Sequence, residues 1–229
     1  MRIGLRKKLV LLIALMSYLL TALDNSLVLT SLTRIQADLH LSQISLSWIQ
    51  DAYGLAFGSF ILLSGRLGDM YGRKLMMEIA LALFAVSSLV TAISTAAAMT
   101  IASRFVQGMG AAILAPTSLA LLVDYFTEPM LSKAIAWYSS IAGLGMSIGL
   151  SLGGILTSYL NWRVGFYLNA AVALGLFILS VKTLEQKQAA QADSRIDTLG
   201  SLASVIGSGL LVYAVNGARQ MAPFMIAAL

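Results

Sequence analysis

The chain has 229 residues, of which 59% are hydrophobic and 11% charged, and its mean hydropathy is +0.85. Soluble domains contain about 45–50% apolar and about 25% charged residues, so this composition excludes an ordinary soluble domain and indicates a membrane protein. The sequence has no cysteine, which excludes disulfides and thiolate metal sites. Its net charge of +5 does not come from a basic tract with interleaved aromatic residues, so we expect no nucleic-acid partner.

Several segments reach the roughly 20 mainly apolar residues that a helix needs to cross a hydrocarbon core of about 30 Å. In chain order, the predicted membrane helices are Leu9–Ser31, Leu46–Ser64, Leu75–Ser94, Met99–Val123, Ala134–Ser158, Val164–Val181 and Leu199–Gly217. After them, one more apolar stretch begins near Ala222 and runs to Leu229.

The basic residues between these helices predict how the chain is oriented. If the N-terminus is cytoplasmic, the outer segments contain only Arg34, Arg163 and Arg219. The inner segments then contain Arg2, Arg6, Lys7, Lys8, Arg66, Arg73, Lys74, Lys133, Lys182, Lys187 and Arg195. Because cytoplasmic loops carry an excess of lysine and arginine, this distribution predicts a cytoplasmic N-terminus.

The longest predicted cytoplasmic link, residues 182–198, is polar and charged, and we interpret it as the one domain boundary. Residues 1–181 then form a six-helix bundle. Residues 199–229 contain one further helix and the truncated start of the next.

We single out three ionisable residues inside the predicted helices, because an ionisable group near the bilayer centre costs about 2.5–3.5 kcal/mol: Asp24, Asp51 and Arg104. With a rise of about 1.5 Å per residue, all three lie about 8 Å below the outer face. Opposite charges at one depth can neutralise each other, the arginine binding one or both carboxylates. Two interpretations stay open: a static ion pair that lets the helices insert, or a protonatable cluster that responds to hydration of a cavity and to substrate.

Polar residues on two predicted helices share one face, as expected for the wall of a cavity. The first helix contributes Ser17, Thr21, Asp24 and Asn25. The fourth contributes Arg104, Gln107, Gly108, Ala111, Ala112 and Ala115. Asn25 and Gln107 are therefore candidate cavity residues beside the charged ones. Farther along the fourth helix, Pro116 predicts a kink, which is tolerated where neighbours satisfy the freed carbonyl.

A glycine-rich charged turn, residues 65–74, joins the second and third predicted helices. Gly65, Gly68 and Gly72 permit a tight backbone path, and Asp69 is placed to cap a helix N-terminus. Arg73, which precedes Lys74, can reach a nearby acid. The expected partner of Arg73 is Asp124, at the inner end of the fourth helix. The alternative is a positive-inside topology signal with incidental glycines.

The fifth predicted helix has Gly145, Gly149 and Gly153 at four-residue spacing, with Gly154 adjoining. Such a small-residue stripe lets a helix backbone approach its neighbour closely, so we expect a packing surface here.

These motifs together resemble the major facilitator superfamily. The loop pattern G-x-L-x-D-x-x-G-R-[KR] is complete at residues 65–74, and R-x-x-Q-G-x-G-A-A is complete at residues 104–112. Residues 48–53 fit the W-x-x-D-A-Y pattern of the second helix. Two motifs depart from the family. Leu150 stands where drug antiporters have proline, and the first helix keeps Leu23 and Asp24 but has Ser26, Leu29 and Thr33 where its motif has Thr, Asn and Pro.

The resemblance implies an all-α polytopic membrane protein with the major facilitator fold. The short link followed by further apolar spans resembles the arrangement in the fourteen-helix drug:proton antiporters. This resemblance implies that the chain contains the N-terminal six-helix bundle and about one and a half further helices, and that the C-terminal half is missing. It also implies that Arg104 takes part in proton coupling. The turn would belong to a conformational latch formed by Gly65, Asp69, Gly72, Arg73, Lys74 and Asp124.

The predicted function is therefore proton-coupled efflux of drug-like or amphipathic compounds by alternating access, in the cell (plasma or inner) membrane. The expected partners are the lipid bilayer, a small-molecule substrate and protons, with no cofactor and no metal. Export of an endogenous metabolite or siderophore is an alternative, as is a truncated membrane module that does not transport. An enzyme is not expected, because no P-loop, H-E-x-x-H or nucleophile elbow occurs.

Overall fold

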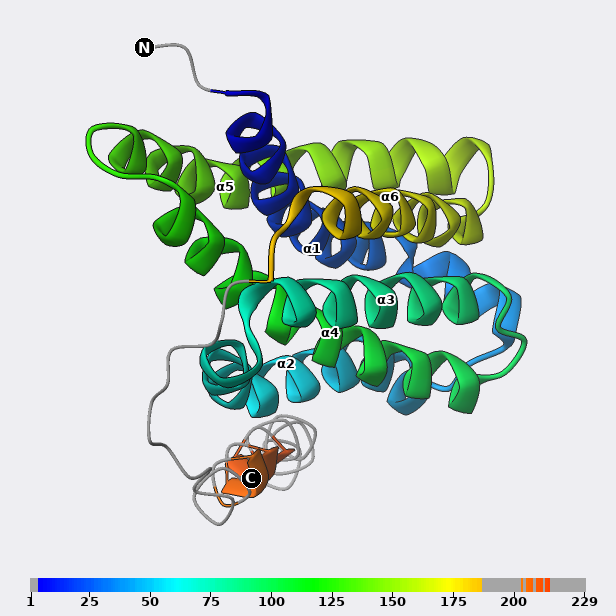
Figure 1. Ribbon diagram of the computed structural model, residues 1–229. Helices are drawn as coiled ribbons and strands as arrows, with labels where there is room; N and C mark the ends of the chain where they lie inside the picture. The colour runs from blue at the N-terminus through cyan, green and yellow to red at the C-terminus, as the bar shows by residue number, and fades with distance from the viewer. Residues whose placement is uncertain (1–3, 187–202, 204, 208, 212, 215–229) are drawn as a thin grey trace, which may run out of the picture.

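The computed structural model describes residues 4–186, 203, 205–207, 209–211 and 213–214, and long α-helices dominate it (Figure 1). The helices are α1 (Leu5–Leu39), α2 (Gln43–Tyr71), α3 (Arg73–Ala92), α4 (Ala97–Tyr125), α5 (Met130–Tyr159) and α6 (Trp162–Thr183). All six are long and apolar enough to cross a membrane. The chain is thus an all-α, multi-pass membrane protein, whereas the cytoplasmic N-terminus stays a prediction.

Each of the first six predicted spans coincides with one of these helices, and most helices extend beyond the apolar span. Helix α1, for example, ends at Leu39 rather than Ser31. A backbone near lipid satisfies its polar groups most easily by remaining helical into the headgroup region, so hydropathy alone sets the ends too short. Of the predicted seventh helix, the described residues between 203 and 214 are helical. The rest of residues 187–229, including most of the predicted link, lies outside the described residues.

The helices form two groups, with α1, α5 and α6 on one side of the bundle and α2, α3 and α4 on the other (Figure 1). Helix α1 packs along α5, α2 packs along α4, and α3 contacts both α4 and α6. Exchanging α1 with α4, α2 with α5 and α3 with α6 converts the main contacts into one another. This is the contact pattern of two inverted three-helix repeats, and it places α1 and α4 together at the centre.

Glycines bring α5 close to α1. A Cβ atom built on Gly149 would lie 2.7 Å from the Cβ of Ser26 and 3.1 Å from the Leu23 carbonyl oxygen. Gly145 and Gly153 face α1 in the same way, so the structure places these three predicted packing glycines in one interface. Gly154 has no neighbour within 4 Å of such an atom and lies outside that interface, because it is rotated about 100° from Gly153.

Helix α4 continues through Pro116, which cannot donate a hydrogen bond to the Ala112 carbonyl. The Ser64 hydroxyl of α2 lies 2.7 Å from that carbonyl oxygen and donates to it. The hydroxyl of Tyr138 on α5 donates to the Ala115 carbonyl at 2.9 Å. Neighbouring helices thereby satisfy backbone groups around the proline, which is what allows a proline inside a membrane helix.

Candidate functional site

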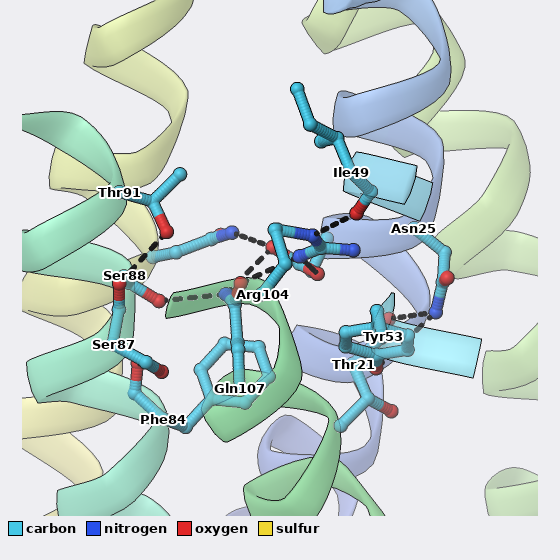
Figure 2. Close-up of polar contacts among 12 residues, drawn as sticks. Thr21, Asn25, Ile49, Tyr53, Phe84, Ser87, Ser88, Thr91, Arg104 and Gln107 are labelled. Atoms are coloured by element: carbon cyan, nitrogen blue, oxygen red, sulfur yellow. Dashed lines mark hydrogen bonds and ion pairs between the residues drawn. The ribbon is translucent and has the colours of Figure 1, made fainter. Parts of the chain in front are cut away.

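The centre of the bundle contains a fully buried ion pair between α1 and α4. Arg104 Nη1 donates to Asp24 Oδ2 at 2.6 Å, and the two side chains are only 1% and 0% exposed. The structure therefore brings together two of the three charged residues that the sequence predicted at one depth. In Figure 2 Arg104 lies between residues of several helices, which converge on its guanidinium group.

The Asp24 carboxylate accepts hydrogen bonds from three side chains. Besides Arg104, it receives Gln107 Nε2 at 2.9 Å and Asn169 Nδ2 at 2.8 Å, both on Oδ1. These three partners are donors, and one of them is charged, so the arrangement stabilises an ionised carboxylate. Asn169 belongs to α6, which ties a third helix to the pair.

Gln107 is held at both ends of its amide. Its Oε1 accepts from Arg104 Nη1 at 2.5 Å, and its Nε2 also donates to the Ser88 hydroxyl of α3 at 2.8 Å (Figure 2). Because Arg104 can only donate, the amide oxygen must face it and the amide nitrogen must face Asp24. The arginine therefore fixes the orientation of Gln107.

Helix α2 covers the arginine with two groups. Arg104 Nε donates to the Ile49 carbonyl at 3.3 Å, and the guanidinium carbon lies 4.3 Å from the centroid of the Tyr53 ring, a cation–π contact. The Tyr53 hydroxyl lies 3.4 Å from Asn25 Nδ2, which also donates to the Thr21 carbonyl at 3.0 Å. Asn25 is exposed and Tyr53 is buried. The Tyr53 side chain therefore lies between exposed Asn25 and buried Arg104.

Asp51, the third charged residue that the sequence placed at this depth, lies elsewhere around its helix. Ile49 and Tyr53, two residues before and after it, are the groups through which α2 contacts the arginine. At about 100° per residue, Asp51 points about 200° away from each of them, and it is partly exposed. Its predicted place in one cluster with Arg104 and Asp24 is therefore not what the structure shows.

The buried cluster, defined here as Asp24, Arg104, Gln107, Asn169, Ser88 and Tyr53, joins α1, α2, α3, α4 and α6. Removing one partner of a buried ion pair typically costs about 3–5 kcal/mol, because the other charge is then left buried without a counter-ion. The cluster is also sensitive to one proton, because a neutral Asp24 no longer balances Arg104. Among the residues that the structure describes, no group of histidine, cysteine, aspartate or glutamate side chains is suited to hold a metal ion.

Sequence reasoning missed Asn169, Ser88 and the buried role of Tyr53. Asn169 was detectable, because it is the only amide side chain in the predicted sixth span and amides, like charges, are costly in hydrocarbon. A further acid, Glu78, lies inside the third span and was not counted among the ionisable residues. Its Oε1 is 3.8 Å from Lys74 Nζ, one helical turn earlier.

The turn between α2 and α3 is a single residue, Gly72, with φ 89° and ψ 148°, a backbone conformation essentially limited to glycine. Gly65 and Gly68 lie within α2, so they do not form the tight path that the sequence suggested. Gly65 has open space around it, and the Arg73 guanidinium covers Gly68.

Arg73 forms its ion pair with Asp69, four residues earlier, and not with Asp124 as the sequence predicted. Helix α2 continues to Tyr71, and the short turn keeps the two side chains adjacent. The first turn of α3 has no side-chain cap, so Asp69 does not cap this helix through a hydrogen bond. Lys74 donates to the Val181 carbonyl at 3.3 Å, which connects the turn to the end of α6.

Comparison with known proteins gives a consistent result. The family model of the Major Facilitator Superfamily matches residues 14–229. The puromycin resistance protein pur8 of Streptomyces alboniger is 38% identical over 92% of this chain and 42% of its own length. EfpA, an MFS-type transporter of Mycobacterium tuberculosis, is 34% identical over 86% of this chain and 37% of its own. The cephamycin export protein CmcT of Amycolatopsis lactamdurans is 31% identical over 92% of this chain and 44% of its own length. The chain thus spans about two fifths of the length of these relatives.

Proposed function

Because this chain belongs to the Major Facilitator Superfamily, we propose that it acts in proton-coupled efflux of drug-like, amphipathic compounds across the cell membrane by alternating access. A transporter, rather than an enzyme, is what the relatives and the membrane helices support. The observation that carries the proposal is the Asp24–Arg104 ion pair, buried at the centre of the bundle. The proton gradient supplies the energy, and no cofactor is needed.

The ion pair is suited to couple a proton to a movement of helices. With Asp24 ionised, the carboxylate attracts Arg104 and holds α1 against α4 at 2.6 Å. When Asp24 binds a proton, it loses the negative charge, and the buried guanidinium loses its counter-ion. The contact between the two central helices then weakens. Since α1 and α4 are equivalent positions of the two inverted repeats, a change between them alters how one repeat sits on the other.

The proposed substrates follow from the relatives and from the surface beside the cluster. Relatives at 28–38% identity carry names that refer to resistance to, or export of, puromycin, cephamycin, methylenomycin and tetracenomycin. We infer antibiotic-like organic molecules as the substrate class, with puromycin as the first compound to test. Exposed Asn25, next to Tyr53, is the residue through which a bound molecule would reach the arginine.

The test uses everted membrane vesicles from cells that express the full-length gene product. Addition of puromycin to acidified vesicles should release protons in the wild type, and Asp24→Asn should abolish this release while the protein still inserts. Asp38→Asn is the matched control, because Asp38 lies on the same helix outside the cluster, where it pairs with Arg163. Wild-type proton release by the Asp24→Asn variant would contradict the proposal.

A further inference from the structure

We propose that Asn169 of α6 is a positioning residue that follows the protonation state of Asp24. In the present structure its amide nitrogen donates to the carboxylate at 2.8 Å. After Asp24 binds a proton, the amide turns, and its oxygen accepts from the new carboxyl O–H. The functional meaning of this switch rests on the proposed proton coupling, but the switch itself can be measured without transport.

The first step of the argument is the lack of an acceptor for a proton on Asp24. The three hydrogen bonds to its carboxylate come from Arg104 Nη1, Gln107 Nε2 and Asn169 Nδ2, and all are donations to it. A protonated carboxyl group is itself a donor and needs an acceptor. In a fully buried site, a donor without an acceptor costs the desolvation of that group. Proton uptake therefore requires one neighbour to present an oxygen.

The second step identifies which neighbour can do so. Arginine has no acceptor atom. The Gln107 amide is fixed on both sides, since its oxygen binds Arg104 at 2.5 Å and its nitrogen binds Asp24 and Ser88. Turning that amide would break all of these contacts and direct its nitrogen at the arginine.

Asn169 has no such restraint. Its side chain is buried, at 3% exposure, and within the described part of the chain it makes one hydrogen bond, the one to Asp24. Rotation about its terminal torsion exchanges the amide oxygen and nitrogen at nearly the same positions, so no backbone movement is needed. Asn169 can thus donate to the carboxylate and accept from the acid in the same place.

The charges around Asp24 do not offer another partner for the proton. Arg104 faces it from α4, and Tyr53 and the partly exposed Asp51 belong to α2, where Tyr53 covers the arginine. Helices α3 and α6 contribute the neutral Ser88 and Asn169 to the cluster. Helix α5 packs on α1 through its glycines.

The switch would divide the bundle in a defined way. Proton uptake weakens the attraction between α1 and α4, because Arg104 loses its counter-ion. The hydrogen bond between α1 and α6 persists in both states, because Asn169 reverses its role. Helices α1 and α6 would then move together relative to α4.

The experiment is pH-induced infrared difference spectroscopy on the purified 229-residue chain in lipid nanodiscs. The Asp24 carboxyl band is identified by its loss in Asp24→Asn. In the wild type we expect protonation of Asp24 to be accompanied by a shift of a side-chain amide C=O band. That band should respond to isotopic labelling of asparagine and not of glutamine. This measurement needs no variant at position 169 and so does not depend on whether such a variant folds.

Variants then assign the band to one residue. Asn169→Leu keeps a similar volume without hydrogen bonds, so the amide band should vanish. The Asp24 carboxyl band should still be present, because Asn169 is not the residue that binds the proton. Ser180→Ala is the control, since it removes another buried polar group of α6 far from Asp24, and it should leave both signals unchanged.

Three results would overturn the inference. The amide band could follow glutamine labelling and disappear in Gln107→Leu, which would make Gln107 the adaptable partner. The amide band could persist in Asn169→Leu, which would make Asn169 a packing residue only. Asp24 could show no protonation band while the chain stays folded. Failure of the proposed function is distinguishable, because the vesicle assay would then be negative while the amide band is present.

Discussion

Two aspartate–arginine ion pairs in this molecule have the same chemistry and opposite surroundings. Asp24 and Arg104 come from helices α1 and α4 and are 0% and 1% exposed in their side chains. Asp69 and Arg73 flank the turn between α2 and α3 and are 58% and 25% exposed. The first pair is surrounded by further donors and an aromatic ring, whereas the second is accessible to water.

This difference decides what each pair contributes to the fold. Water and ions screen the exposed pair, and such pairs contribute about 0–1 kcal/mol to stability. Around the turn, the backbone conformation of Gly72 is the more demanding feature. Water does not reach the charges of the buried pair, so loss of either partner leaves an isolated charge in a medium of low dielectric constant. A stability measurement therefore reports on the buried pair, while a transport measurement is needed for the exposed one.

The largest effect is expected for Arg104→Ala. The change leaves Asp24 without a counter-ion, which should lower the free energy of unfolding in mixed micelles by about 3–5 kcal/mol at a pH where Asp24 is ionised. Arg73→Ala, the same substitution in the exposed pair, should cost about 1 kcal/mol or less.

Arg104→Lys refines this comparison. Lysine retains the charge but not the fork that lets Arg104 bind Asp24, Gln107 and Ile49 together, so efflux should be clearly impaired. If Arg104→Ala and Arg73→Ala destabilised the protein equally, burial would not be what distinguishes the two pairs.

A smaller effect is expected for Gly72→Ala. An alanine at φ 89° and ψ 148° is strained, and the cost should be about 1–3 kcal/mol in the same unfolding experiment. Gly65→Ala is the matched control, because Gly65 lies in helix α2 with no atom within 4 Å of an added Cβ. That change should be neutral or should stabilise the helix by about 0.5–1 kcal/mol. Equal costs at the two positions would mean that backbone strain does not set the shape of the turn.

The smallest effect on stability is expected for Asp69→Asn. The amide keeps the size of the side chain and removes the charge that attracts Arg73, so the free energy of unfolding should change by less than about 1 kcal/mol. Efflux by the full-length gene product should nevertheless fall strongly, because we expect the charge to act between conformations rather than within one. Efflux at the wild-type rate would show that the pair has no role in transport.

The sequence by itself determined the membrane helices and the common level of two central charges. Hydrophobic length is a local property of the chain, and a helix is the natural form for a single segment in lipid, so the six described spans were predictable and are confirmed. Counting residues along two helices also placed Asp24 and Arg104 at one level, since the rise per residue is fixed. Membership of the family followed from two complete motifs and is confirmed as well.

Only the tertiary structure decided which side of each helix faces which neighbour. Counting gives the height of a residue along its own helix, but the rotation of that helix is set by packing against the others. For this reason Asp51 lies on another side of α2 than Ile49 and Tyr53, and Asn169 completes the site from a helix for which the sequence predicted no site residue. The choice of Asp69 over Asp124 as the partner of Arg73 has a similar origin, because it depends on α2 remaining helical to Tyr71.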